Sequence, residues 1–315
     1  MINRNAIKAV FEGSLKLKST ESFLVVTDKT KEHIGRAFYE YASGITGKTD
    51  IVVIRPAKEH AEEPPHEVAE KMLRYDVELL VTEKSLTHTR ARRAATAKGA
   101  RIATMPMITE DIANRCLDID YEALRKRSRE IYRLLAGGEK VRVSTKIGTD
   151  ITFFVGNSGF FGQDGGSYDT EGAYGNLPEG EVSFAPSACE GVFIVDASFP
   201  ELGKLDSPIT FKVKNGAVSD IAGDGSGKIM KRLDAVGPRA YIVAELGIGL
   251  NPKAKVIGNI LEDEKVIGTV HIAVGNNCSY GLNNDVPLHL DGVIKKPSIY
   301  VDGKPIMVDG EFCQL

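Results

Sequence analysis

The sequence of 315 residues contains no long apolar run. Its longest runs, such as residues 51–54, are far too short to cross a bilayer, and its first residues lack the apolar stretch of a signal peptide. A net charge of −3 gives no electrostatic reason to expect a nucleic acid or an anionic membrane as a partner. We therefore expect no nucleic-acid partner, no membrane association and, by default, a cytoplasmic location.

Cysteine is scarce as well, and the four cysteines form no C-x-x-C pair. They are Cys116, Cys189, Cys278 and Cys313. In a chain of this size such cysteines are most simply buried or free thiols in a reducing compartment.

Glycine-rich nucleotide motifs are also missing. No G-x-G-x-x-G follows the first predicted strand. Residues 223–228, GDGSGK, resemble a phosphate loop, but Ala222 and Ile229 stand where that motif needs glycine and serine or threonine. We interpret GDGSGK as a turn before a helix, and nothing supports a nucleotide-binding domain.

The first part of the chain, residues 1–137, alternates between strand and helix patterns. Apolar runs at 23–26, 51–54 and 77–81, with a shorter one at 101–103, predict strands buried on both faces. Helical patterns cover residues 5–17, 27–43, 67–75, 88–98, 110–116 and 120–136. This alternation predicts an α/β domain, a parallel sheet wrapped by helices.

Residues 138–315 change to period-two patterns and predict a β-rich α+β domain, with the boundary near Gly137-Gly138. Hairpins are predicted at 148–150, 215–216 and 302–303, and one helix at 228–235. Between Gly156 and Gly175 lies a glycine-rich segment, which is either a disordered insert or a binding loop beside a metal site.

Histidines and acids concentrate between residues 244 and 292. His289 and Asp291 lie two residues apart in a strand pattern, so their side chains share one face and can offer a nitrogen and an oxygen to the same metal. His271 lies in a second strand pattern, GTVHIAVG. Taken alone, each of these residues is as well explained by a structural hydrogen bond.

Four further carboxylates extend this set. Glu245 ends the apolar run YIVAE, where a carboxylate is costly unless it is paired or bound to metal. Glu181 opens the strand pattern EVSFAP, with an exposed turn residue as the alternative. Glu264 and Asp285 also lie close in sequence, and a solvated charge run is the alternative for Glu264. Nitrogen and oxygen ligands without thiolates suit Zn, Mn, Co or Fe, as one ion or two.

Four segments in this order resemble the M29 family of metallo-aminopeptidases, the aminopeptidase T group. They are NLPEGEVSFAP (176–186), AELGIGLNP (244–252), DEKVIGTVHIAVG (263–275) and HLDGV (289–293). The resemblance implies a metal centre with Glu245 bridging two ions. The implied ligands are Glu181, Glu245, Glu264, His271, His289 and Asp291.

This resemblance implies an aminopeptidase-like hydrolase that removes N-terminal residues from short peptides, with two Zn, Co or Mn ions activating a hydroxide. It also implies a homodimer. Glu181 and Tyr280 are the implied catalytic residues. Aminopeptidases of the family carry a catalytic tyrosine where this chain has Cys278, so Tyr280 can serve only if the loop is reshaped.

The same motifs are similar to those of dioxygenases that open 2,5-dihydroxypyridine. This second resemblance implies one Fe(II) ion held by His271, His289 and Asp291, with open positions for oxygen and a small-molecule substrate. A third interpretation is a metal-binding protein without peptidase activity. The two-metal hydrolase is the leading hypothesis from the sequence, and the dioxygenase is the alternative.

Overall fold

The computed structural model describes residues 1–157 and 159–313. Their contacts divide the chain into two units, Met1–Arg125 with Gly166–Glu179, and Lys126–Gly165 with Gly180–Leu315. The division falls inside helix α6 (Tyr121–Ala136), upstream of the boundary predicted near Gly137. No helix in the described part of the chain is long and apolar enough to span a membrane.

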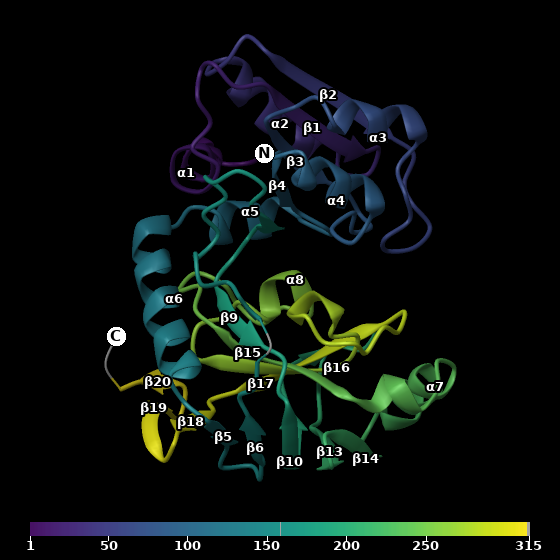
Figure 1. Ribbon diagram of the computed structural model, residues 1–315, viewed down its shortest axis with the longest axis vertical. Coiled ribbons are helices and arrows are strands. Elements are labelled where there is room, and N and C mark those ends of the chain that lie inside the picture. Colours follow the sequence, from purple (N-terminus) through teal and green to yellow (C-terminus); the bar gives the residue numbers. More distant parts are fainter. Residues whose placement is uncertain (158, 314–315) are drawn as a thin grey trace. The chain divides into compact units, whose positions relative to one another are not determined.

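The first unit is built on a parallel sheet, and the α/β prediction is confirmed (Figure 1). Among the described residues its strand order is β2 (Thr49–Ile54), β1 (Phe23–Asp28), β3 (Val77–Val81), β4 (Arg101–Thr104) and β8 (Tyr174–Asn176). Strands β1, β3 and β4 are buried along their whole length, as strands covered on both faces must be.

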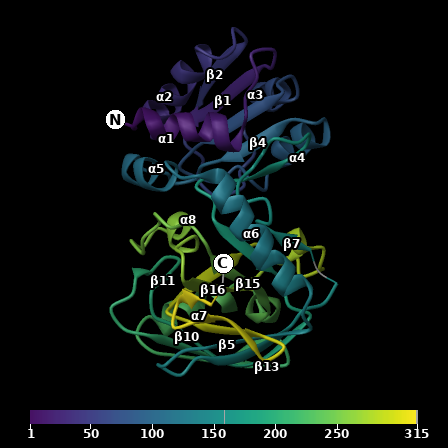
Figure 2. The same ribbon diagram turned by 90° about the vertical axis from the view of Figure 1, so that its left-hand side faces the viewer.

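Helices alternate with these strands and supply the covering layers (Figures 1 and 2). They are α1 (Arg4–Ala9), α2 (Glu32–Ser43), α3 (His66–Met72), α4 (Arg90–Ala97) and α5 (Glu110–Cys116). The side chain of Thr109 accepts a hydrogen bond from the Ile112 N–H and caps α5, as its place before the helix predicts. The helix predicted from Thr27 begins only at Glu32, because Thr27 and Asp28 complete β1.

The glycine-rich segment explains why each of the two units is made of two separate stretches of the chain. Its last residues form β8, which pairs in parallel with β4 and so joins the first unit. Its earlier part forms β7 (Phe160–Phe161), which pairs with β9 in the second unit. The segment thus contributes one short strand to each of two sheets, while Ser158 lies outside the described residues.

The second unit holds two antiparallel sheets in its described part, as the β-rich prediction requires. The first has the order β14 (Ala217–Ala222), β13 (Ile209–Lys214), β10 (Ala188–Val195), β6 (Asp150–Phe154), β5 (Lys140–Ser144), β18 (Ser298–Val301), β19 (Lys304–Val308) and β20 (Glu311–Phe312). The second has the order β12 (Gly203–Lys204), β11 (Ser198–Phe199), β17 (His289–Lys295), β16 (Thr269–Gly275), β15 (Val243–Gly249), β9 (Glu181–Phe184) and β7.

The three predicted hairpins are confirmed as the pairs β5–β6, β13–β14 and β18–β19. The GDGSGK segment is a turn that leads into α7 (Ser226–Asp234), with Gly225 at the helix start at a φ of 85°. Glycine tolerates that left-handed conformation without a steric penalty.

The core of this unit lies between its two sheets. The ring centroids of Phe193 and Phe211 stack 4.6 Å apart, and Phe199 from the other sheet lies 5.8 Å from Phe211. A Cβ atom on Gly292 would lie 2.5 Å from Val195, so β17 and β10 approach closely through this glycine. Figures 1 and 2 show β15 and β16 between the eight-stranded sheet and helix α8 (Ile260–Asp263). One face of β15, β16 and β17 therefore packs in the core, and the alternate side chains face α8.

Candidate metal centre

Strand pairing brings the predicted ligands onto that second face. In the ladder, Glu245 of β15 lies opposite Ala273 of β16, and Ala273 lies opposite Asp291 of β17. Gly247 lies opposite His271 in the next row. Residues opposite each other in an antiparallel pair point to the same face. Glu245, His271 and Asp291 therefore project together around the small side chain of Ala273.

Two glycines make room for this arrangement. A Cβ atom on Gly247 would come well under 3.0 Å from Nε2 of His271, closer than real Cβ atoms come, so the imidazole lies directly over this glycine. Gly249 lies opposite Glu181 of β9, which also faces the site. Because Gly247 and Gly249 carry no side chain on this face of β15, Glu181 and His271 can approach each other there. Oε2 of Glu181 lies 3.2 Å from Nε2 of His271.

Glu245 is the centre of the cluster. Its Oε1 lies 3.2 Å from Nε2 of His271, and its Oε2 lies 2.9 Å from Nε2 of His289. The same His289 nitrogen lies 3.3 Å from Oδ1 of Asp291. The six predicted ligands form three overlapping groups whose ligand atoms lie within 4.8 Å of one another: Glu181, Glu245 and His271; Glu245, His289 and Asp291; and Glu264, His271 and Asp291.

The orientation of His289 is set by the backbone. Its Nδ1 lies 2.7 Å from the carbonyl oxygen of Asn276 and donates to it, which leaves Nε2 with its lone pair toward the carboxylates in the neutral ring. The His289 side chain is 32% exposed, whereas that of His271 is 1% exposed. Solvent therefore reaches the site on the His289 side.

The protonation of the cluster reflects its crowded negative charge. Burial opposes a charge on His271, but the hydrogen bond to Glu245 and the charge of Glu181 outweigh it and raise the pKa of His271 to about 9. The pKa of His289 is also raised against burial, chiefly by Asp291. Burial raises the pKa of Glu264 to about 8. Protons bound to His271, His289 and Glu264 thus offset part of the negative charge of these carboxylates.

The donor set fits a divalent metal ion. Among the described residues, Oε2 of Glu181 and Oδ1 of Asp291 are buried, with an imidazole nitrogen at 3.2 and 3.3 Å but no hydrogen bond, and Nδ1 of His271 is buried without a hydrogen-bond partner. Buried polar atoms are rarely left so unless an ion or water satisfies them. Imidazole nitrogens with carboxylate oxygens, and no thiolate, are ligands that Zn, Mn and Fe accept.

The structure refines the sequence interpretation of three carboxylates: it corrects the position of Glu245 in its strand, places Glu264 in the cluster as predicted, and leaves Asp285 outside it. Glu245 lies inside β15 rather than at its end, because the strand continues to Gly249. Glu264 does not belong to a solvated charge run: it follows α8 directly and its side chain is only 14% exposed. Asp285 is exposed, accepts a hydrogen bond from Asn276, and belongs to none of the three ligand groups.

Sequence reasoning missed Lys265. Its side chain has no exposed area, and its Nζ lies 2.7 Å from Oε1 of Glu181 and 2.5 Å from Oε1 of Glu264. The available signal was its position directly after Glu264 in the run LEDEK, because a lysine beside a predicted carboxylate ligand can pair with it.

Tyr280 reaches the same site from the loop after β16. Its ring is buried and packs edge-on against Phe161 of β7, with centroids 4.8 Å apart. Its hydroxyl lies 2.7 Å from Oγ of Ser183. Burial and then the charge of Glu245 raise the pKa of Tyr280 well above its usual value, so the hydroxyl keeps its proton. Cys278 is exposed at the start of the same short helical turn.

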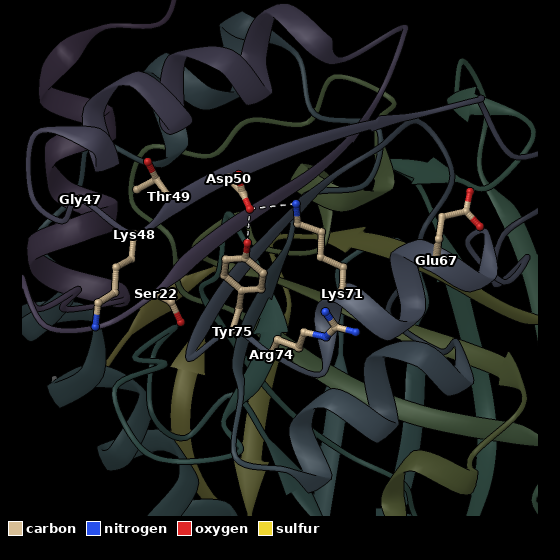
Figure 3. Close-up of a pocket in the computed structure, with 9 residues that line it drawn as sticks. All are labelled: Ser22, Gly47, Lys48, Thr49, Asp50, Glu67, Lys71, Arg74 and Tyr75. Carbon is tan, nitrogen blue, oxygen red and sulfur yellow. Dashed lines mark hydrogen bonds and ion pairs between the residues drawn. The ribbon is translucent and has the colours of Figure 1, made fainter.

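A cavity of about 660 Å³ lies elsewhere, at the amino ends of β1 and β2 in the first unit (Figure 3). Figure 3 shows the Asp50 carboxylate in it paired with Lys71 and with the Tyr75 hydroxyl. It contains none of the predicted ligands. In parallel sheets ligands bind beyond the carboxyl ends of the strands, so this cavity is not the candidate site.

Comparison with known proteins places the chain in a family. The family model described as 2,5-dihydroxypyridine 5,6-dioxygenase matches residues 55–314. The chain belongs to this family. The 2,5-dihydroxypyridine 5,6-dioxygenase of Pseudomonas putida KT2440 is 22% identical over 250 residues, which cover 74% of this chain and 70% of that protein.

Solved structures agree on the fold. The structure of 2,5-dihydroxypyridine dioxygenase from Pseudomonas putida KT2440 superposes with a TM-score of 0.85 at 18% identity, covering 99% of this chain and 96% of that one. AmpT from Thermus thermophilus gives a TM-score of 0.67 at 17% identity, covering 99% of both chains. The M29 resemblance is thus supported as a shared fold, and the M29 family assignment is not.

Proposed function

We propose that the protein is a ring-cleaving dioxygenase that acts on a dihydroxylated nitrogen heterocycle of the 2,5-dihydroxypyridine class. One Fe(II) ion would be held by His271, His289 and Asp291. The observation that carries the proposal is that two imidazoles and one aspartate project from adjacent strands onto one face of the sheet, where Asp291 shares one ligand group with His289 and another with His271. Two histidines and one carboxylate with free positions are the ligand set of non-haem iron oxygenases. Family membership supports the same choice.

An iron ion in such a site supplies open coordination positions and the redox chemistry of an oxygenase. Residues of the chain would orient the ligands and hydrogen-bond to the substrate. The Asn276 carbonyl fixes the His289 ring. Burial would raise the pKa of Glu245, but its hydrogen bonds to both imidazoles hold it well below the usual value, so Glu245 stays ionised and can accept a hydrogen bond from a substrate hydroxyl. The protonated Tyr280 hydroxyl can donate a hydrogen bond to the same substrate.

A two-metal aminopeptidase-like hydrolase is the second candidate. The presence of Glu181, Glu245 and Glu264 in the same cluster favours it, because three extra carboxylates exceed what one iron ion needs. A centre of this kind would activate a water molecule for attack on a peptide carbonyl.

Metal content and oxygen uptake separate the two candidates. Protein reconstituted anaerobically with Fe(II) should consume oxygen when 2,5-dihydroxypyridine is added. Asp291→Asn should abolish this uptake, and Asp220→Asn, a change of an exposed carboxylate on β14, should leave it at the wild-type rate. Release of N-terminal residues from a short peptide with Zn, Co or Mn, without oxygen uptake under Fe(II), would refute the proposal.

A further inference from the structure

The buried ammonium of Lys265 has no part in the ligand set proposed above, yet it lies inside the cluster. Its side chain is fully buried, and its Nζ contacts Oε1 of Glu181 at 2.7 Å and Oε1 of Glu264 at 2.5 Å. A buried charge is tolerated only when it is closely paired, and here two carboxylates share one ammonium. The ammonium therefore neutralises charge that a metal ion would otherwise neutralise.

The fold fixes the position of Lys265 through the backbone. The Asn251 N–H donates to the Lys265 carbonyl at 2.8 Å, and the Lys265 N–H donates to the Glu262 carbonyl at 2.9 Å. A Cβ atom on Gly249 would come well under 3.0 Å from the Val266 carbonyl oxygen, so the backbone after Lys265 lies directly against β15. The close approach at Gly249 thus holds Lys265 at the edge of the site, beside the glycines that leave room for Glu181.

This position bears on how many ions the cluster can hold. Of the three groups of possible ligands, one includes Glu181 and another includes Glu264, the two carboxylates that Lys265 pairs with. The third group, Glu245, His289 and Asp291, contains neither of them. A divalent ion bound by Glu181 or Glu264 would be repelled by the ammonium that contacts both carboxylates, whereas an ion held by His271, His289 and Asp291 uses neither of them.

We propose that the ammonium of Lys265 takes the place of one metal ion, so that the centre holds a single divalent ion on the side of His289 and Asp291. The proposal rests on the proposed function for the identity of the ligands. It makes Lys265 the residue that sets metal stoichiometry in a cluster with enough carboxylates for two ions.

The test is metal counting with Zn²⁺ as the probe, which requires no catalysis. Wild-type protein, Lys265→Met and Lys265→Gln are stripped of metal, titrated with Zn²⁺ by calorimetry, and analysed for bound zinc after desalting. Lys295→Met is the matched control, because Lys295 is an exposed lysine on β17, paired with Asp196. We expect one ion per chain in the wild type and control, and two in both Lys265 variants.

Stability gives a second readout. Removal of the ammonium takes one ion-pair partner from each of Glu181 and Glu264, so the metal-free Lys265 variants should melt at a lower temperature than the wild type. A second equivalent of Zn²⁺ should raise the melting temperature of these variants and leave that of the wild type unchanged. Failure of both variants to fold even in excess Zn²⁺ would overturn the proposal, because a metal ion then cannot replace the ammonium.

The outcomes also separate this proposal from the proposed function. One ion in the wild type and one in each folded variant would overturn the role of Lys265 and leave the dioxygenase standing. One ion in the wild type and two in the variants, without oxygen uptake by the iron-loaded wild type, would support Lys265 and refute the dioxygenase. Two ions in the wild type would overturn the role of Lys265, and oxygen uptake by the iron-loaded wild type would then decide the dioxygenase by itself.

Discussion

Gly247→Ala adds a single carbon atom beside the His271 ring and so tests whether His271 is a metal ligand. An added Cβ would come well under 3.0 Å from Nε2 and Cε1 of His271, a distance that real Cβ atoms do not show. The ring must therefore move by about 1 Å or more, whereas metal ligands keep their distances within about 0.2 Å. Changes that only disturb the support of a ligand cost about 10–100-fold in metal affinity, so we expect at least that loss here.

The assay is calorimetric titration of the metal-free protein with Zn²⁺ and with Fe(II) under anaerobic conditions. Gly227→Ala is the control, because a Cβ atom at Gly227 in α7 would meet nothing within 4 Å. That change should leave metal affinity as it is, and should stabilise the helix by up to about 1 kcal/mol. A Gly247→Ala protein that binds metal with wild-type affinity would refute the assignment of His271 as a ligand.

Three other predictions concern Glu78 in β3 and Tyr280 beside the metal centre. Glu78 is fully buried in β3, neither of its carboxyl oxygens has a hydrogen-bond partner, and burial raises its pKa. Glu78→Met should therefore raise the free energy of unfolding at pH 7 by roughly 1–3 kcal/mol, measured by denaturant titration. A variant less stable than the wild type would contradict this. Because the folded state holds the Glu78 proton more tightly than the unfolded state, this site makes stability fall as pH rises from the ordinary carboxyl range to the raised pKa, and the variant should lose that slope. Tyr280→Phe should lower the turnover rate and leave zinc content unchanged, whereas lost zinc would show that the hydroxyl is needed to hold the metal site.

The fold followed from the sequence where local patterns decide it. The period-two pattern of GTVHIAVG places His271 on one face and Val270, Ile272 and Val274 on the other, and β16 has that arrangement. The helix before Gly137 and the three hairpins follow from capping and turn residues in the same way. These features depend on neighbours in the chain, which the sequence shows directly.

The remaining features depend on contacts between distant segments. The pairing of β8 with β4 assigns Gly166–Glu179 to the first unit, and no local pattern in that glycine-rich stretch indicates it. Glu264 looks solvated in sequence because it ends a run of three acids, yet its side chain is only 14% exposed and is paired with Lys265. Sequence spacing likewise does not reveal that the ammonium of Lys265 contacts both Glu181 and Glu264 inside the cluster.

The most direct test of the account is the fate of isotopically labelled oxygen. Iron-loaded protein should open 2,5-dihydroxypyridine or a related dihydroxylated heterocycle and place both atoms of ¹⁸O₂ in the ring-opened product, measured by mass spectrometry. A product that takes its new oxygen only from water, formed without oxygen consumption, would contradict the dioxygenase and return the centre to hydrolytic chemistry.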